Sequence, residues 1–324
     1  MTVSFAPKVS VIMNCLNGEK YLRKAIDSVY TQTYTNWEIV LLDNASIDCT
    51  AKIANSFDQK LRYFRNDVTI PLGQARNTAL RQAQGELIAF LDSDDVWLPN
   101  KLEKQIPLFE NAPLVGLVFS DTILRYQEDR ESSTYFSEHH YFPPKGKIFP
   151  ALLCHYSIPM LTTVIRKEVL EALEQWFDES YKVCDDFDFF LRVAYAWNCD
   201  YVNEPLASCL IHNEAATVRY HRHAAGEKLK TLNKLCARYP SIEENYGAEL
   251  GKLRGQIAYT QGKSLWRDGE STAARATFKS YIGSPKFFAT YLATFLPYPW
   301  AESLIRLLRR GLASLRISCH RFAG

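Results

Sequence analysis

The chain has 324 residues, of which 47% are hydrophobic and 23% are charged, and its formal net charge is +2. These proportions are ordinary for a globular protein of about two domains, and they exclude a collagen-like or intrinsically disordered chain. The near-neutral charge disfavours a nucleic-acid-binding protein, which would carry a clustered basic excess. The charge is uneven, because residues 286–324 hold six Lys or Arg and one acid, so a basic partner surface is expected only there.

The cysteines and the N-terminus indicate the compartment. Eight cysteines are spread along the chain without a Cys-x-x-Cys pair, which gives no zinc-site spacing and favours buried thiols in a reducing environment. We find no signal-peptide pattern and no apolar run of about 18 residues that would predict a transmembrane helix. The expected location is therefore the cytoplasm.

Short apolar segments alternate with helical ones over the first 120 residues. Strands are predicted at 8–13, 37–42, 61–65, 87–91 and 115–120, and helices at 19–32, from about 48, at 73–84 and from about 99. This alternation predicts an α/β fold with a parallel sheet, in which ligands bind beyond the carboxyl ends of the strands. Two of these ends carry acidic turns, 43–46 and 92–95, and we expect them to form one site.

The second half of the chain is predicted to become increasingly helical. Residues 127–148 are interpreted as a mobile loop, 161–166 as a strand, 185–197 as a helix with Phe189, Phe190, Val193 and Trp197 facing inward, and 201–211 as extended chain. Helices are predicted at 224–238, 243–266 and 270–281. We therefore expect a catalytic domain at 1–222, divided into halves of about 1–120 and 121–222, followed by a helical region at 223–324.

The predicted helix at 300–318 is basic and amphipathic. It places Leu304, Leu308, Leu312 and Leu315 on one face and Arg306, Arg309, Arg310 and Arg316 beside it. Such a helix can lie in a membrane surface. Packing against the rest of the chain accounts for the same pattern equally well, so a peripheral location at the inner membrane face is one of two expectations.

Acidic residues at two places could do chemistry. Asp92-Ser93-Asp94 follows a predicted strand and could hold Mg²⁺ or Mn²⁺ together with a diphosphate, although helix capping is the simpler explanation of this tripeptide alone. Asp185-Asp186 begins a predicted helix. One of these carboxylates could act as a general base, or both could simply complement the helix dipole.

Two basic residues have a similar pair of interpretations. Arg76 follows Gly73 near a helix start, where it could meet a phosphate or remain a solvated surface residue. His212 could complete a metal shell or be an ordinary strand histidine. Taken singly, the ordinary interpretation is favoured for both.

Five motifs together make the pattern specific. In chain order they are Val9-Ser10-Val11-Ile12 with Asn17-Gly18, Asp43-Asn44-Ala45-Ser46-Ile47-Asp48, Gly73-Gln74-Ala75-Arg76-Asn77, Gly85-Glu86 with Phe90-Leu91-Asp92-Ser93-Asp94-Asp95, and Asp185-Asp186-Phe187-Asp188 with Leu191-Arg192. Over residues 7–215 this order resembles the family 2 glycosyltransferases of the GT-A fold, a Rossmann-like sheet flanked by helices.

The resemblance implies metal-dependent, inverting transfer from a nucleotide-diphosphate sugar, with a UDP-sugar favoured and Mg²⁺ or Mn²⁺ as cofactor. It assigns the role of catalytic base to Asp186. The residues that it assigns to the donor are Asn14, Asp43, Asn44, Arg76 and Asp92. Those that it assigns to the metal are Asp92, Asp94 and His212. The acceptor is expected to be a glycan or a lipid-linked sugar, as in cell-surface polysaccharide synthesis.

The sequence also bears on alternative functions. The Gln-x-x-Arg-Trp motif of processive synthases is absent, which predicts one sugar added per event. A nucleotidyltransferase that makes the activated sugar would also use an acidic strand end, but Leu16-Asn17-Gly18-Glu19 lacks its Gly-rich basic loop. A non-catalytic protein of the same fold remains an alternative, whereas a dehydrogenase is disfavoured because no GxGxxG follows the first strand.

Overall fold

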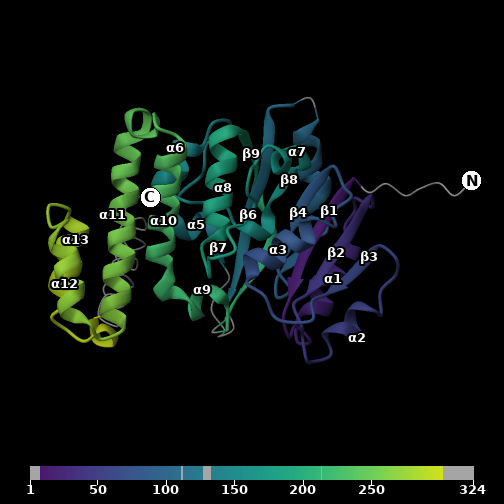
Figure 1. Ribbon diagram of the computed structural model, residues 1–324, viewed down its shortest axis with the longest axis horizontal. Helices are drawn as coiled ribbons and strands as arrows, with labels where there is room; N and C mark the ends of the chain where they lie inside the picture. Colours follow the sequence, from purple (N-terminus) through teal and green to yellow (C-terminus); the bar gives the residue numbers. More distant parts are fainter. Residues whose placement is uncertain (1–7, 111, 127–132, 213, 302–324) are drawn as a thin grey trace, which may run out of the picture.

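The computed structural model describes residues 8–110, 112–126, 133–212 and 214–301. Figure 1 shows a twisted sheet with helices on its faces and, on the side away from the N-terminus, a further layer of long helices. The chain enters through the sheet and ends its described part in this helical layer.

One nine-stranded sheet organises the fold, in the order β3-β2-β1-β4-β8-β6-β9-β5 with β7 paired to β6. Its parallel part is formed by β1 (Val9–Cys15), β2 (Trp37–Asp43), β3 (Leu61–Arg65) and β4 (Leu87–Phe90). These four strands lie where the sequence predicted them. The predicted α/β class is confirmed.

The rest of the sheet is mixed, which agrees with the mostly parallel sheet that was expected. β8 (Val164–Arg166) runs antiparallel to both β4 and β6 (Val115–Tyr126), while β6 is parallel to β9 (Asn198–Ile211). β5 (Val96–Trp97), which the sequence analysis missed, pairs antiparallel with β9. A two-residue strand gives no alternation of apolar and polar residues, so no sequence pattern marks it.

Alternate residues of the central strands face two separate cores. Val9, Val11 and Met13 of β1 pack into one cluster, and Ile12 packs into the other. The first cluster is covered by α1 (Leu22–Tyr30) and α4 (Lys101–Gln105), the second by α3 (Leu72–Leu80) and α8 (Asp185–Ala196). The short α2 (Thr50–Ala54) follows β2. The sheet is therefore buried on both faces, as its continuous apolar strands require.

The described part of the segment predicted as a loop at 127–148, residues 133–148, is not all loop. It contains β7 (Ser133–Thr134) and α5 (Tyr135–His139), and Phe136 is 1% exposed against Phe119. The polar and proline-rich composition concealed this aromatic anchor. Residues 127–132 lie outside the described part of the chain.

Several short helices were also not predicted. They are α6 (Phe149–Cys154), α7 (Lys167–Glu171), α9 (Ala216–Arg219) and α13 (Pro285–Ala293). Most have only one or two turns, which is too short for a hydrophobic periodicity to emerge. The predicted helix at 185–197 ends at Ala196, with Phe189, Phe190 and Val193 buried as expected and Trp197 only partly buried.

The C-terminal helices extend the core beside α8. α10 (Ala224–Arg238) packs on α8, α11 (Ile242–Arg267) packs on α6, and α12 (Ser271–Lys279) and α13 lie outermost in Figure 1. Leu232, Leu235 and Ile257 belong to the same hydrophobic cluster as Ile12 of β1. The predicted basic helix at 300–318 falls outside the described residues beyond Ala301. Within the described part, no helix combines the length and apolarity needed to cross a bilayer.

Candidate active site

A pocket of about 280 Å³ opens beyond the carboxyl ends of β1 and β4. The turn after β4 contributes Asp92 and Asp94, α3 contributes Arg76, and the start of α8 contributes Asp185 and Asp186. The far wall comes from the end of β9 and the start of α9. The structure thus brings together residues from three motifs that are up to about a hundred positions apart in the chain.

Asp94 and His212 face each other at the edge of this pocket. His212 Nε2 lies 2.8 Å from Asp94 Oδ2, and the two side chains are 8% and 30% exposed. Tyr21 packs against the imidazole with a centroid distance of 5.8 Å. The neighbouring Asp95 has a structural role instead, because its buried carboxylate accepts a hydrogen bond of 2.8 Å from the Leu210 amide and so ties the turn after β4 to β9.

The donor set fits a divalent cation that shares its coordination shell with a ligand. No group of three or more His, Cys, Asp or Glu side chains among the described residues is arranged to hold a metal ion unaided. Mg²⁺ and Mn²⁺ are commonly bound through one or two carboxylates, with substrate phosphates and water supplying the other ligands. Asp94 with His212, and Asp92 on the same turn, match this open arrangement.

Arg76 is buried between acidic groups. Its Nη1 donates a 2.6 Å hydrogen bond to Asp185 Oδ2, and its Nη2 lies 3.4 Å from Asp92 Oδ1. The guanidinium also lies 5.5 Å from the centroid of the Phe177 ring. The side chain is only 7% exposed, so its orientation is fixed before any ligand binds.

Asp186 lines the pocket next to this ion pair. Its Oδ1 accepts a 2.7 Å hydrogen bond from the Phe187 amide, and its Oδ2 accepts one of 3.3 Å from Tyr156 Oη. Burial and the neighbouring Asp185 carboxylate raise the pKa of Asp186 to about 6, against the opposing effect of Arg76. A carboxyl group with this pKa is ionised at neutral pH and still basic enough to accept a proton from a hydroxyl in a transition state.

Asp43 is the last residue of β2, and Asn44 follows it. The Asp43 carboxylate is completely buried and accepts hydrogen bonds from the Ser46 amide, from Tyr63 Oη and from Arg65 Nη1, at 2.7, 2.6 and 3.2 Å. Asn44 uses both side-chain atoms on the loop that follows β3: its Nδ2 donates to the Ile70 carbonyl at 2.8 Å, and its Oδ1 accepts from the Ile70 amide at 3.0 Å. Neither residue lines the pocket that contains Asp94 and Asp186.

Asn14 does line the pocket, at the end of β1. Its Oδ1 is buried and has no hydrogen-bond partner among the described residues. A buried polar atom without a partner is unfavourable unless a ligand or water satisfies it. Asn14 is therefore suited to accept a hydrogen bond from a ligand bound in the pocket.

Two further residues, which the sequence did not indicate, support the site. Tyr156 contacts Asp186, and burial together with the Asp186 charge raises its pKa well above the ordinary value, so it remains a hydrogen-bond donor. Glu227 of α10 accepts hydrogen bonds from the amides of three consecutive residues that precede α8, namely Lys182, Val183 and Cys184. Both contacts join segments far apart in the chain, so no local motif announces them.

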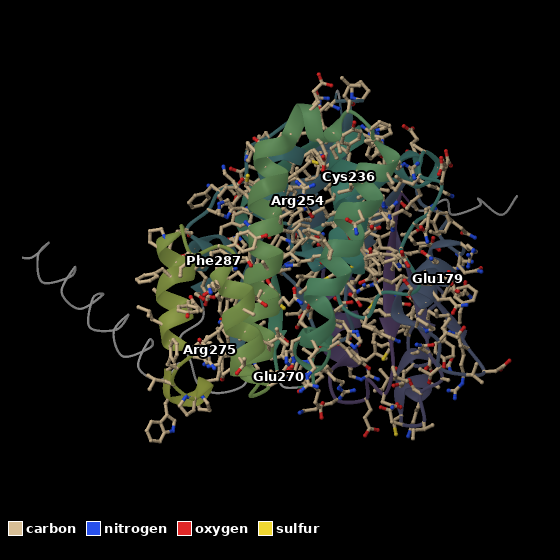
Figure 2. All side chains as sticks on the ribbon, turned by 60° about the vertical axis from the view of Figure 1, so that its left-hand side comes forward. Glu179, Cys236, Arg254, Glu270, Arg275 and Phe287 are labelled. Atoms are coloured by element: carbon tan, nitrogen blue, oxygen red, sulfur yellow. The ribbon has the colours of Figure 1, made fainter. Side chains whose placement is uncertain are left out.

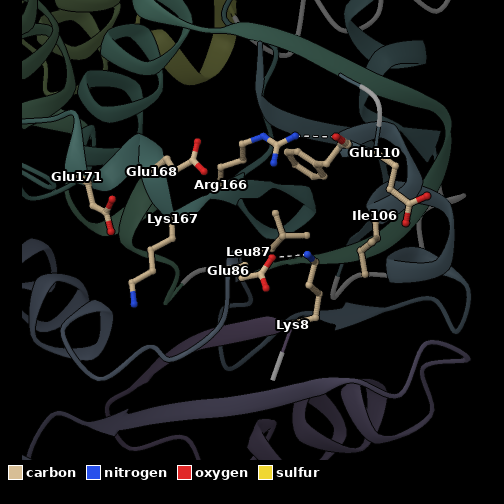
Figure 3. A pocket seen from close by; sticks show the side chains of 10 residues that line it. Lys8, Glu86, Leu87, Ile106, Glu110, Arg166, Lys167, Glu168 and Glu171 are labelled. Atoms are coloured by element: carbon tan, nitrogen blue, oxygen red, sulfur yellow. Dashed lines mark hydrogen bonds and ion pairs between the residues drawn. The ribbon is translucent and has the colours of Figure 1, made fainter. Parts of the chain in front are cut away.

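A second, larger pocket of about 460 Å³ lies at the opposite, amino-terminal edge of β1 and β4 (Figure 3). Its cations are already used within the protein. Lys8 pairs with Glu86, and Arg166 donates to the carbonyls of Phe109 and Val115 at 2.6 and 2.9 Å. These contacts tie the ends of strands together.

Comparison with known proteins decides the family. The model of Glycosyl transferase family 2 matches residues 10–173, about half of the chain, including β1, the turn after β4 and Arg76. The chain belongs to this family. It is a glycosyltransferase, as the sequence motifs predicted.

Individual relatives agree with this assignment. Residues of this chain are 45% identical over 101 positions to the Escherichia coli UDP-Glc:alpha-D-GlcNAc-diphosphoundecaprenol beta-1,3-glucosyltransferase WfgD, a match that covers 31% of this chain and 40% of the enzyme. The structure of the mannosyltransferase PcManGT from Pyrobaculum calidifontis, in complex with GDP-Man and Mn²⁺, has a TM-score of 0.61 at 18% identity, covering 94% and 88% of the two chains. The structure of S. aureus TarS 1-349, in complex with UDP-GlcNAc, has a TM-score of 0.57 at 18% identity, covering 89% and 90%. The two structures share the fold with this family 2 glycosyltransferase.

Proposed function

We propose that the chain transfers one sugar from a nucleotide-diphosphate sugar to an acceptor hydroxyl, with inversion and with the help of Mg²⁺ or Mn²⁺. The observation that carries this proposal is the placement of Asp186, a carboxyl group with a pKa of about 6, in the same pocket as Arg76 and as Asp94, which His212 contacts. Asp186 can accept the proton of the acceptor hydroxyl. Arg76, together with Asp94 and His212, can stabilise the departing diphosphate.

The donor side is proposed to consist of Asn14, Arg76, Asp92 and Asp94. Asp94, His212 and Asp92 would hold the divalent cation, which supplies Lewis-acid stabilisation of the diphosphate when bound. Arg76 adds a fixed positive charge at the same place, oriented by Asp185 and Asp92. A UDP-sugar is the proposed donor, supported by the UDP-sugars in the names of WfgD and of the TarS complex, while the PcManGT complex supports a role for Mn²⁺.

Asp43 and Asn44 are proposed to act on the nucleotide indirectly. Their side chains hold the loops after β2 and β3 in place through Ser46, Arg65 and Ile70. A base-binding role for the side chains themselves would require them to exchange these internal hydrogen bonds for bonds to the nucleotide. We therefore propose that Asp43 and Asn44 shape the nucleotide site by holding these loops in place.

Asp186 performs the acceptor half of the reaction. Its carboxylate takes the proton as the acceptor oxygen attacks the anomeric carbon, and the bond to the diphosphate breaks on the opposite face. A single displacement of this kind inverts the configuration, as it does in glycoside hydrolysis by a single displacement. Tyr156, which donates to Asp186 Oδ2, keeps the carboxylate directed at the pocket.

A lipid-linked sugar or surface glycan is the proposed acceptor, supported by the lipid-diphosphate acceptor in the name of WfgD.

The residues 300–318 are proposed to bind the inner face of a membrane that carries this acceptor. Flotation with anionic vesicles tests this part: the full chain should float and a chain lacking 300–324 should not. A truncated chain that still floats would contradict the membrane role of these residues.

The central experiment combines binding and transfer. Calorimetry with UDP, GDP, dTDP and CMP, each with Mn²⁺ and with EDTA, should show metal-dependent binding of UDP. Asp186→Asn should keep this binding and lower transfer by about 10²- to 10⁴-fold, the usual contribution of a general base. Asp27→Asn, which removes an exposed carboxylate of α1, is the matched control and should change neither.

Three results would contradict the proposal. Failure of every nucleotide to bind would favour a non-catalytic protein of this fold. Release of diphosphate from a nucleoside triphosphate and a sugar phosphate would favour a nucleotidyltransferase. Full transfer by Asp186→Asn would show that the base is another residue.

A further inference from the structure

A cavity of about 640 Å³ lies outside the donor pocket, between the helical region and the end of α6. Its walls come from Lys228 of α10, the Lys252–Thr260 stretch of α11, and Ser284 to Phe287 at the start of α13, with His155 after α6 closing one side. Figure 2 shows Phe287 on α13, beside α11. Nothing in the proposed donor chemistry uses this cavity.

The cavity is strongly cationic. Lys228, Lys252 and Lys286 line it together with His155, and its described lining residues include no carboxylate. The nine-residue helix α13 also begins there, with Ser284 as its N-cap. The first amides of a helix lack intrahelical partners and carry the positive end of the helix dipole, so this helix start adds to the attraction for an anion.

Two contacts connect the cavity to the proposed base. Lys228 Nζ lies 5.3 Å from the centroid of the Phe187 ring, next in the chain to Asp186, and the Lys228 charge acts on the Asp186 carboxyl group. On the other side, His155 directly precedes Tyr156, whose hydroxyl donates to Asp186 at 3.3 Å. The cavity therefore borders the segments that carry Phe187 and Tyr156, the two residues that contact or adjoin Asp186, whereas Arg76 and Asp94 line the other pocket.

We propose that this cavity binds the phosphate or diphosphate group of the acceptor. The inference rests on the proposed function and deepens it, because it defines the acceptor as a sugar whose anomeric oxygen carries a phosphate. A hydroxyl of that sugar lies at Asp186, while the phosphate, on the other side of the sugar ring, is held by Lys228, Lys252 and Lys286. The diphosphate of the donor stays with Arg76 and Asp94, so the two anionic groups occupy separate sites and do not compete.

The first test uses inorganic diphosphate and does not depend on transfer. Calorimetric titration of the full chain in EDTA, which prevents metal-mediated binding at Asp94, should show binding of diphosphate. The double variant Lys252→Gln/Lys286→Gln should bind at least tenfold more weakly. Both lysines are exposed, so the variant should fold normally. Lys279→Gln removes one charge from α12, outside the cavity, and should bind as the parent does.

Absence of diphosphate binding, or equal binding by parent and double variant, would overturn the proposal. The same preparations are titrated with UDP and Mn²⁺. Loss of UDP binding in every protein would count against the proposed function, whereas intact UDP binding with unchanged diphosphate binding would count against the cavity alone.

The second test identifies the source of the phosphate. Transfer is measured to N-acetylglucosaminyl diphosphate bearing a short alkyl chain, to N-acetylglucosamine 1-phosphate, and to the alkyl glycoside without phosphate. The double variant should raise KM for the two phosphorylated acceptors about tenfold and leave the donor KM unchanged. A preference for the alkylated diphosphate indicates a lipid-linked acceptor, and equal use of the two phosphorylated acceptors indicates a soluble one. Equal use of the unphosphorylated glycoside by the parent would overturn the proposal.

Discussion

Arg76 and Asp185 are 109 positions apart in the chain, and their side chains meet at 2.6 Å in the candidate site. The pair joins α3, which carries the proposed diphosphate contact, to the first turn of α8, which carries the proposed base. A charge change at either residue is therefore felt at both ends of the pocket. This coupling gives Asp185 a measurable influence on Asp186.

Replacing Asp185 should shift the pH dependence of transfer. The Asp185 carboxylate raises the pKa of Asp186, whereas Arg76 lowers it. In Asp185→Asn the first effect disappears and the second is no longer offset, so the pKa of Asp186 should fall. The acidic limb of the profile of kcat against pH, expected near pH 6 in the parent, should move to lower pH. An unmoved limb in Asp185→Asn would show that Asp186 is not the group that titrates.

Asp186 should also reduce the stability of the protein at neutral pH. Its pKa is raised in the folded state to about 6 from the ordinary value of 3.8, so the folded chain holds this proton more tightly than the unfolded chain does. Stability is then lost as the pH rises between these two values. Asp186→Asn should raise the melting temperature at pH 7, and the difference should vanish below pH 3.8. A variant less stable than the parent at pH 7 would contradict this account.

Asp94 and Asp95 offer a direct comparison of a proposed metal-binding carboxyl group and a structural one. Asp94 faces His212 in the pocket, whereas Asp95 is buried, holds the Leu210 amide, and has its pKa raised well above the ordinary value by burial and by Asp92. Asp94→Asn should weaken Mn²⁺-dependent UDP binding by at least about 10- to 100-fold, the loss typical when only an outer-shell partner of a metal ligand is removed. Asp95→Asn keeps an oxygen that can accept the hydrogen bond from the Leu210 amide, so this variant should bind nearly as the parent does. Equal losses of UDP binding in Asp94→Asn and Asp95→Asn would contradict separate roles for the two carboxyl groups.

Glu227 should act as a positioning residue for the base. Its carboxylate receives the amides of Lys182, Val183 and Cys184, at 2.6, 3.0 and 2.9 Å, immediately before the turn that carries Asp186. In Glu227→Gln a neutral amide replaces the carboxylate that accepts these three hydrogen bonds. This change should lower the free energy of unfolding by roughly 1.5–3 kcal/mol. We expect kcat to fall about tenfold with the KM for the donor unchanged, because the donor residues lie on other elements.

The matched control for Glu227 is Glu244→Gln, which removes an exposed carboxylate from α11. Chemical denaturation and steady-state kinetics on both variants separate the two effects. A parallel rise in the donor KM, or a loss of kcat in the control, would show a general disturbance of the helical region.

The sequence predicted the parts of this protein that depend on local pattern. Strands β1 to β4 read as apolar runs, and α10 as an amphipathic stretch with the observed bounds. The acidic turn after β4 and the Asp185-Asp186 pair were recognised as motifs of the family. These features are encoded within a few consecutive residues, so one sequence is enough to reveal them.

What the sequence did not predict depends on long-range contacts. Tyr156 and Glu227 become part of the site only because α6 and α10 pack beside α8, and a lone Tyr or Glu carries no motif. A strand was predicted at 161–166, but the antiparallel direction of β8 follows only from its pairing with β4 and β6. Asp43 was recognised from its motif, but its burial beneath Tyr63 and Arg65 follows from the register of β2 against β3.

The buried Lys101 should be a source of instability unrelated to the active site. Its side chain is completely buried on α4, lies 4.1 Å from the centroid of the Trp97 ring, and has no hydrogen-bond partner for Nζ among the described residues. Burial lowers its pKa well below the ordinary value of 10.5, so the folded chain binds this proton less tightly than the unfolded chain. Stability should therefore rise with pH up to about 10.5.

Lys101→Met, which fills a similar volume without the charge, should stabilise the protein at pH 7 by about 2 kcal/mol, and this gain should shrink as the pH approaches 10.5. Lys104→Met on the same helix removes a partly exposed lysine paired with Glu204 and should give no such gain. Melting curves of the three proteins between pH 7 and pH 10 decide the matter, because a destabilised Lys101→Met, or a gain that does not change with pH, would mean that the buried ammonium is not the source of the instability.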